Sequence, residues 1–455
     1  MSVKNTDTQV MVRDTKDHAK TTLMFTHTRV CASSYVKIKL NEENENMNKN
    51  TRLSSLKKAE IAINEKRPQD ALLRFEVSSP ETIERALKVQ DLTAEDAPPH
   101  IINIIQRKVS ENLANLGMGE IRVIRGNPIV SVADNYDRLL FPYDNAGRSS
   151  TYTRYADEEH VLRTHTSALV PETFRNFYKE FNGNIPDTIF LFPGLVYRRD
   201  VIDPKHLDVF HQLDVWTLRK DGDRGPVARE DLLRLVNSIF DAVFSSKVKP
   251  IVNEVIHPYT IDGIEVYAKS DKFELEVLEA GLAHPEVLKE AGFDPQKYSG
   301  LALGMGLDRL VMSFKAVPDI RYLRSTDPRI TSQMLNLEKF KNVSDKPPIS
   351  RDMSYCIPNN YTDEDICEEI KEAFGDEAYL IEDVKISART KYDDLPQIAK
   401  DRLGATKGQD NVLVKITLRH PDKTLTREQA NELYDQAYPR LNKGTKGYVR
   451  SEYGG

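Results

Sequence analysis

The amino-acid sequence predicts an α+β protein with two folded domains behind a polar N-terminal extension. A strand–loop–strand pattern spans residues 189–220, and amphipathic helical spacing occupies 101–117 and 230–246. From residue 345 onward, strands and helices follow the order βαββαβ. At ~100–200 residues per domain, 455 residues are enough for two or three domains.

The composition is that of a globular protein, with 39% hydrophobic and 29% charged residues. No apolar run approaches the ~18–20 residues that span a bilayer, so we expect no membrane partner. The net charge of −6 means that any nucleic acid must be bound by a local basic surface. The three cysteines, Cys31, Cys356 and Cys367, lack metal-binding spacing, which favours a reducing compartment without disulfides.

Residues 1–67 differ in composition from the rest of the chain. The Asn/Glu-rich run at 41–50 has almost no apolar side chains, so we expect a disordered extension with a short strand near 30–40. The first 40 residues hold seven Lys or Arg and three Asp, and they lack the apolar core of a secretory signal. Because the three aspartates are unusual in a transit peptide, the expected compartment is the cytoplasm, with the mitochondrial matrix as the alternative.

Residues 68–343 are expected to form the first domain. In its helix at 101–117 the apolar residues keep helical spacing, and Gly117 is a C-terminal stop. The other expected elements are a helix at 78–90, two strands within 120–134 around a Gly126-Asn127 turn, the strands of 189–220, a helix at 230–246, a strand leading into a helix at 273–288, and a Gly-rich strand running into a helix at 301–314.

Residues 344–455 are expected to form the second domain, after a linker at 345–350. The expected elements are strands at 352–357, 378–388, 411–419 and 447–450 with helices at 363–374 and 426–442, an order typical of the ferredoxin-like split motif. Residues 345–399 are acidic, whereas 400–455 hold 11 Lys or Arg against 7 Asp or Glu. The basic half could contact phosphates, and a solvated, sign-balanced surface explains it equally well.

The segment 194–215 is rich in groups that carry chemistry. The alternation FHQLDVWTL predicts a strand with Phe210, Gln212 and Asp214 on one face. An aromatic ring beside an amide and a carboxylate suits a planar ring near an ammonium group. Arg198, at the end of the preceding strand, can bind a phosphate or carboxylate with two parallel bonds. A salt-bridged hairpin is the competing interpretation.

The segment 300–312 combines small residues with a cation. Gly304 and Gly306 allow a ligand or a neighbouring backbone to approach closely. Arg309 follows at a helix start, where it and the helix N-terminus could bind one anion together. Tight strand–helix packing is the alternative. The chain contains no GxSxG nucleophile motif and no Walker A sequence.

Together these segments resemble the class II aminoacyl-tRNA synthetases, and specifically the phenylalanyl-tRNA synthetase family. GLVYRRDVID and FHQLD resemble motif 2 of that family, GLALGMGLDRLVM resembles motif 3, and RTHTS at 163–167 resembles its amino-acid-binding segment. The similarity runs from about residue 98 to 330. The C-terminal part is similar to the ferredoxin-fold anticodon-binding domain. Both parts in one chain without an editing insertion match the single-chain, organelle-type plan.

The resemblance implies a class II antiparallel sheet flanked by helices in 68–343 and an anticodon-binding domain in 344–455. It also implies ATP-dependent attachment of phenylalanine to tRNA(Phe) through an aminoacyl-adenylate, with Mg²⁺ beside the ATP phosphates. ATP, the amino acid and tRNA would be the partners. Class II enzymes usually dimerise and the single-chain members are monomeric, so both a monomer and a homodimer stay open.

The resemblance also assigns roles by position. Arg198 would hold the α-phosphate and the amino-acid carboxylate, and Arg309 the γ-phosphate. Phe210 would stack on adenine. The remaining candidates would bind the amino acid, line the substrate site or carry Mg²⁺: Gln212 and Asp214 at the α-amino group, His165 and Ser167 around it, Gly304 and Gly306 beside the substrates, and Glu276 for the metal.

Two departures from the family concern the amino-acid pocket. The Phe-Pro-Phe loop that packs the substrate ring in the family is not found in 253–271. Tyr259 is the only aromatic residue near the expected place of that loop. Glu279 stands where the family usually has a small residue. We therefore keep two alternatives: a paralogue that activates another amino acid or uses a non-tRNA acceptor, and an inactive RNA-binding relative.

Overall fold

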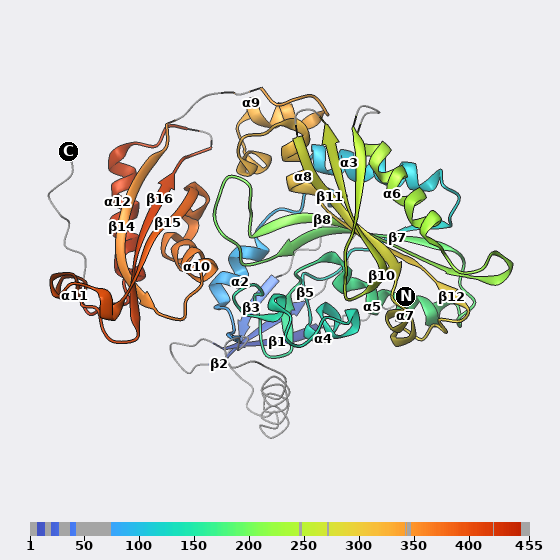
Figure 1. Cartoon of the computed structure of the whole chain (residues 1–455), viewed down its shortest axis with the longest axis horizontal. Coiled ribbons are helices and arrows are strands. Elements are labelled where there is room, and N and C mark those ends of the chain that lie inside the picture. Colours follow the sequence, from blue (N-terminus) through green and yellow to red (C-terminus); the bar gives the residue numbers. More distant parts are fainter. Residues whose placement is uncertain are drawn as a thin grey trace, which may run out of the picture. The chain divides into compact units, whose positions relative to one another are not determined.

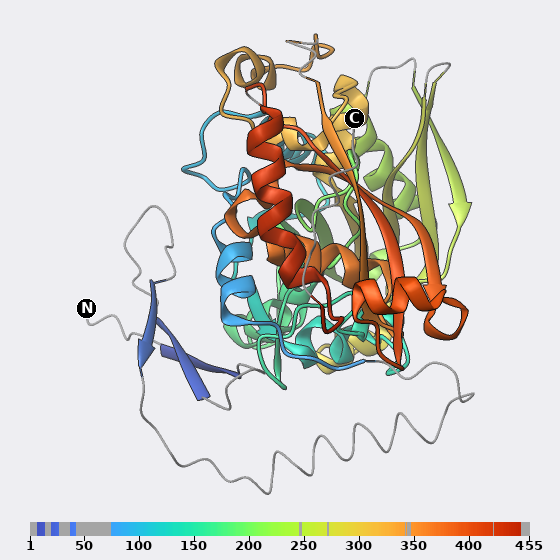
Figure 2. The same ribbon diagram turned by 90° about the vertical axis from the view of Figure 1, so that its left-hand side faces the viewer.

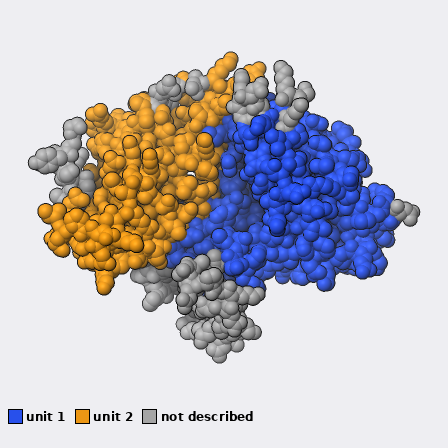
Figure 3. Space-filling model, viewed as in Figure 1, with its two compact units in different colours: residues 1–198, 209–314, 335–337 blue, residues 199–208, 315–334, 338–455 orange. Residues whose placement is uncertain are grey.

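The computed structural model describes residues 7–13, 20–26, 37–41, 74–244, 248–270, 273–341, 343, 347–421 and 423–446. It divides into two compact units (Figure 3). Unit 1 comprises residues 1–198, 209–314 and 335–337, and unit 2 comprises 199–208, 315–334 and 338–455. The loop 199–208 thus belongs to unit 2 although it joins two strands of unit 1. The functional boundary near residue 344 stays a prediction.

The centre of unit 1 is a mostly antiparallel sheet with helices on both sides (Figure 1). This confirms the predicted α+β class. The one parallel pair among the described strands is β4 with β7. Eight described strands form the sheet in the order β4 (Glu120–Val123), β7 (Thr188–Tyr197), β8 (Val209–Lys220), β13 (Leu301–Gly306), β11 (Phe273–Ala283), β10 (Thr260–Ser270) and β9 (Lys249–Glu254), with β12 (Tyr298–Ser299) beside β8.

The helices of unit 1 mostly follow the predicted apolar spacing. In α3 (Ile101–Ala114), Ile105, Val109 and Leu113 are fully buried, and Gly117 beyond its end has the left-handed φ of 64° expected of a stop. The others are α2 (Pro80–Leu87), α4 (Val132–Asn135), α5 (Val170–Glu180), α6 (Arg229–Val243), α7 (Pro285–Glu290) and α8 (Leu307–Lys315). No described helix is long and apolar enough to cross a membrane.

Two local expectations for unit 1 need correction. The strands around Gly126-Asn127 exist but do not pair with each other: β4 joins β7, and β5 (Ile129–Ser131) pairs with β6 (His160–Leu162). Helix α5 was not predicted. Its residues Phe174 and Phe177 are buried against Phe190 and Trp216 of the sheet, so the helix is stabilised by tertiary packing that no local pattern reports.

The C-terminal part of unit 2 has a three-stranded antiparallel sheet in the order β14–β16–β15. Helices α10 and α12 contact each other and share the apolar core of the sheet, and Figure 2 shows α12, in red, beside the orange strands. The elements are β14 (Ile349–Pro358), α10 (Asp363–Phe374), β15 (Ile381–Lys391), α11 (Gln397–Leu403), β16 (Gln409–Leu418) and α12 (Arg427–Leu441). Helix α11 was not predicted, and the expected strand at 447–450 lies outside the described residues.

The loop 199–208 is held within unit 2 by apolar and polar contacts. Ile202 is buried in the core of this unit, and its carbonyl oxygen accepts a hydrogen bond from the Val384 N–H at 3.0 Å. Arg199 lies 3.0 Å from the fully buried Asp365 on α10. A loop predicted as part of the first domain is therefore anchored to the fold of the second unit.

Three described strands lie in the N-terminal extension: β1 (Asp7–Arg13), β2 (Lys20–Thr26) and β3 (Lys37–Asn41), paired antiparallel in that order. The sequence predicted a strand only near the third. The first two contain runs of β-branched and apolar residues, QVMV and TTLMF, which favour strands but were outweighed by the polar composition of the segment. Much of 1–67 lies outside the described residues.

Candidate active site

Strand β8 carries the predicted row of site residues. Phe210, Gln212 and Asp214 alternate with the buried residues Val209, His211, Leu213 and Val215 along it, and Asp214 is itself fully buried. On the neighbouring strand β13, Gly304 pairs with Asp214 and Gly306 pairs with Gln212. A side-chain carbon at position 304 would lie 3.0 Å from Asp214 Oδ1, a tight contact that the Asp214 side chain would have to relieve by a small shift.

The buried carboxylate of Asp214 has one satisfied and one free oxygen. The Ser167 hydroxyl donates to Asp214 Oδ2, and the Trp216 indole N–H donates to Ser167 Oγ at 3.1 Å. Asp214 Oδ1 and the neighbouring Gln212 Oε1 have no hydrogen-bond partner among the described residues. Since buried acceptors are normally paired, these two oxygens indicate a ligand that donates hydrogen bonds, such as an ammonium group.

Arg198 lies beside these acceptors, at the end of β7. Its Nε donates to the Thr164 carbonyl oxygen at 2.8 Å, which fixes the plane of the guanidinium. The guanidinium carbon lies 5.1 Å from the centre of the Phe210 ring and 5.5 Å from that of Tyr152. The structure thus brings Arg198 and Phe210 together, and the cation occupies one face of the ring expected to stack on adenine.

His165 contributes a neutral polar group to the site. Its Nε2 lies 2.9 Å from the Asn135 carbonyl oxygen and therefore acts as the donor, which leaves Nδ1 as an acceptor that no described residue satisfies. Burial and the positive charge of Arg198 lower the pKa of His165 to about 3, so the imidazole is neutral near pH 7. Its ring stacks on Phe141 with a centroid separation of 5.4 Å.

Arg309 and Glu276 are close enough for the charge of the arginine to act on the carboxyl group. Arg309 is exposed on the first turn of α8, and its charge, together with that of Arg198, acts to lower the pKa of Glu276. Desolvation and the negative charges of Glu279 and Glu265 outweigh this effect and raise that pKa. A bound divalent cation would relieve the repulsion among these carboxylates, so the residues present fit the predicted metal position. No group of three or more His, Cys, Asp or Glu side chains among the described residues is arranged to hold a metal by itself.

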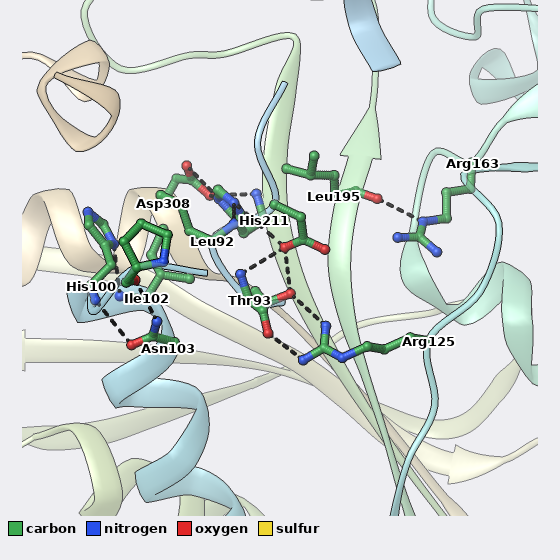
Figure 4. A network of polar contacts seen from close by, with 12 residues as sticks. Leu92, Thr93, His100, Ile102, Asn103, Arg125, Arg163, Leu195, His211 and Asp308 are labelled. Atoms are coloured by element: carbon green, nitrogen blue, oxygen red, sulfur yellow. Dashed lines mark hydrogen bonds and ion pairs between the residues drawn. The ribbon is translucent and has the colours of Figure 1, made fainter. Parts of the chain in front are cut away.

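Sequence reasoning did not assign a role to the buried pair His211–Asp308, which Figure 4 shows at the centre of a polar network. Both side chains are essentially unexposed. The His211 N–H donates to Asp308 Oδ2 at 2.5 Å, and His211 Nδ1 lies 3.0 Å from the same oxygen. His211 Nε2 accepts from the Leu92 N–H at 2.9 Å. The pair thereby links β8 to the start of α8, next to Phe210 and Arg309.

Two arginines, the buried Arg163 and the more exposed Arg125, donate hydrogen bonds to the backbone and side chains of the same region. Arg163 donates from Nε to the Leu195 carbonyl oxygen at 2.7 Å, and Arg125 donates to Thr93 Oγ1 at 3.1 Å (Figure 4). Burial lowers the pKa of both guanidiniums. Arg163 is the first residue of the RTHTS segment and Arg125 precedes the Gly126-Asn127 turn, and neither position by itself indicates these contacts.

The loop between β9 and β10 contains a ring, that of His257, which the sequence interpretation did not count. The sequence interpretation found no Phe-Pro-Phe-like loop, yet His257, Pro258 and Tyr259 form a turn with rings on either side of the proline. The rings of His257 and Tyr259 are 6.0 Å apart and inclined by only 20°. Tyr259 also contacts Phe141 and Trp216, each at 5.9 Å between centroids. The ring–Pro–ring pattern was the signal available in the sequence.

The role expected for Asp214, at the α-amino group of the substrate, leads to a prediction about pH dependence. Burial raises its pKa to about 6, against the hydrogen bond from Ser167 and the charge of Arg198. The carboxylate is therefore charged above pH 6 and neutral below it, and a neutral acid attracts an ammonium group less. We expect kcat/KM for the amino acid, measured by ATP–pyrophosphate exchange, to fall about tenfold from pH 7 to pH 5. Ser167→Ala should move this fall to higher pH, and a flat profile in both proteins would contradict the assignment.

Comparison with known proteins adds a family context to this geometry. A family model described as tRNA synthetases class II core domain (F) matches residues 86–334. The chloroplastic/mitochondrial phenylalanine--tRNA ligase of Arabidopsis thaliana is 32% identical over 329 residues, which cover 70% of this chain and 70% of that protein. The mitochondrial phenylalanine--tRNA ligase of Saccharomyces cerevisiae is 27% identical over 435 residues, which cover 78% of this chain and 89% of that protein. A solved pyrrolysyl tRNA synthetase from Desulfitobacterium hafniense aligns with a TM-score of 0.38 at 18% identity, over 52% of this chain and 74% of that one.

Proposed function

The chain belongs to the F family of class II tRNA synthetase core domains, and from this membership we propose that it is a ligase that attaches phenylalanine to tRNA(Phe) at the expense of ATP. The observation that carries the proposal is the pair of buried acceptor oxygens on Asp214 and Gln212, which no described residue satisfies, beside the guanidinium of Arg198. These groups match the ammonium and carboxylate of an amino acid. No other polar cluster described above offers this combination.

The proposed first step joins the amino acid to AMP. The amino-acid carboxylate attacks the α-phosphorus of ATP, a P–O bond forms, and pyrophosphate leaves with the electrons of the broken bond. Arg198 neutralises charge at the α-phosphate and aligns the carboxylate, while Arg309 binds the γ-phosphate. Such a step needs positioning and charge stabilisation and no protein nucleophile. A ribose hydroxyl of the tRNA then attacks the carbonyl carbon of the aminoacyl-adenylate, so that an ester bond forms and AMP leaves with the electrons of the broken C–O bond.

Glu276 is the residue proposed to hold Mg²⁺. The metal would bind mainly through the ATP phosphates with one or two protein carboxylates, and when bound it supplies positive charge that offsets the charge on the phosphates. The raised pKa of Glu276 beside Glu265 and Glu279 supports this position. Phe210 is proposed to stack on adenine on the ring face away from Arg198, and Gly304 and Gly306 to leave room for the substrates.

The remaining assignments rest on the resemblance and the relatives. Residues 344–455 are proposed as the anticodon-binding domain, with the basic 400–455 half in contact with the tRNA. The relatives above are named mitochondrial or chloroplastic/mitochondrial, and they give no support to the expected cytoplasmic location. We therefore propose the mitochondrial matrix. Monomer and homodimer both remain compatible with the chain.

Amino-acid-dependent ATP–pyrophosphate exchange with a panel of amino acids tests the proposal. Phenylalanine is expected to support exchange, and phenylalanine with tRNA(Phe) to give charged tRNA. Exchange only with an amino acid unrelated to phenylalanine would favour the paralogue. No exchange with any amino acid would leave an inactive RNA-binding relative.

A further inference from the structure

Glu279 and His257 bring polar groups into the aromatic part of the site. The His257 imidazole is buried, with 9% of its side chain exposed, and its Nε2 lies 3.2 Å from Glu279 Oε2. That contact lowers the pKa of Glu279. Apart from this ion-pair contact, His257 Nε2 is a buried polar atom with no hydrogen-bond partner among the described residues. It is available to a ligand.

The register of the sheet places this pair opposite the ammonium acceptors. Gly304 pairs with Asp214 on one side and with Glu279 on the other. Directly paired residues project from the same face, so two carboxylates share one face with only a glycine between them. At ~4.8 Å per strand, their strands are about 10 Å apart. An aromatic amino acid held by its ammonium at Asp214 extends over this gap.

Aromatic rings line the way from one carboxylate to the other. His165 stacks on Phe141, Phe141 contacts Tyr259, and Tyr259 stacks on His257. Burial is the main cause that raises the pKa of the Tyr259 phenol, and the charges of Asp214 and Glu279 raise it further. A substrate ring packed against these side chains therefore has its far edge near the His257–Glu279 pair.

We propose that the His257–Glu279 pair is a specificity-determining element that hydrogen-bonds a hydroxyl group on the ring of the amino-acid substrate. The carboxylate accepts a bond from a ring hydroxyl, and the imidazole binds the hydroxyl oxygen. Phenylalanine offers neither partner, but Glu279 remains partly solvated and paired with His257, so phenylalanine is still accepted. Tyrosine is the probe for this class of substrate. The inference rests on the proposed function, because it assumes that the site takes an aromatic amino acid.

The test compares tyrosine with phenylalanine in ATP–pyrophosphate exchange. Glu279→Ala is expected to lower kcat/KM for tyrosine relative to phenylalanine about tenfold, since it removes a hydrogen bond to a partly exposed charged group. His257→Phe, which keeps a ring and removes its polar atoms, is expected to shift the ratio in the same direction. Glu274→Ala is the matched control: its carboxylate lies on the same strand and pairs instead with Lys269. It should leave the ratio unchanged.

Several outcomes separate this inference from the proposed function. A tyrosine-to-phenylalanine ratio that is the same in wild type, Glu279→Ala and His257→Phe would overturn the inference and leave the ligase proposal intact. Exchange with neither amino acid would overturn the ligase proposal. In that case, calorimetric titration with non-hydrolysable phenylalanyl- and tyrosyl-adenylate analogues still decides the inference. The Kd ratio of the two analogues must then change about tenfold in Glu279→Ala, and an unchanged ratio refutes the role of the pair.

Discussion

Replacing Arg309 with alanine is expected to lower ATP–pyrophosphate exchange about 100- to 1,000-fold while the protein keeps its thermal unfolding midpoint. The side chain is exposed on the first turn of α8, so its loss creates no cavity and leaves no buried group unpaired. Its proposed role is to stabilise the charge on the γ-phosphate, and the removal of one preorganised electrostatic contact has effects of this size. Exchange rates and KM for ATP, measured with saturating phenylalanine, check the prediction.

Arg234→Ala is the control for Arg309. Arg234 is an exposed arginine of α6 in the same unit and contacts only a helix neighbour, Asp231, in the described contacts. The Arg234→Ala substitution removes the same charge from the unit and leaves the proposed site unchanged. If both variants lose the same fraction of the exchange rate, the loss is caused by the change in net charge. If Arg309→Ala exchanges at the wild-type rate, Arg309 does not bind the triphosphate.

Replacing Asp308 with alanine is expected to have the largest effect on stability, a loss of about 3–5 kcal/mol in the free energy of unfolding. The change leaves the His211 N–H and Nδ1–H without their acceptor in a fully buried place. His211 cannot simply change tautomer, because its Nε2 accepts from the Leu92 N–H. Denaturant unfolding followed by circular dichroism measures the loss, and exchange activity should fall with it because β8 and α8 lose their link.

Asp308→Asn separates charge from hydrogen bonding at this position. The amide oxygen can still accept one bond, so we expect a smaller loss than with alanine. Glu111→Gln, at an exposed position of α3, makes the same chemical change on the surface and should leave unfolding within about 0.5 kcal/mol of wild type. Equal stability of Asp308→Ala and wild type would show that the His211–Asp308 pair contributes nothing to the fold.

The fold class was predictable because its signals are local. The apolar spacing of 101–117 requires a helix that buries one face, and α3 does bury it. The run LALGMGLDRLVMSF changes from strand to helix at the expected place, where β13 ends at Gly306 and α8 begins at Leu307. The missed helix α5 owes its stability to a partner, the aromatic face of the sheet, which lies outside its own sequence window.

The site could be predicted in part for the same reason. The two-residue period of a strand was enough to place Phe210, Gln212 and Asp214 on one face of β8. It was not enough to show that His211, which points the other way, is buried against Asp308. Nor did it show that His257 faces Glu279, because that contact joins a loop to a strand 22 positions further along the chain.

The sequence by itself determined the helices and strands with strong local periodicity, such as α3 and β8, the candidate residues for the ammonium and phosphate contacts, and the family resemblance. Only the tertiary structure decided the row Asp214–Gly304–Glu279, the membership of loop 199–208 in unit 2, and the buried link between β8 and α8. Periodicity and propensity act over a few residues. Register and burial depend on which distant segments pack together, and one residue of slip would reverse every side chain of a strand.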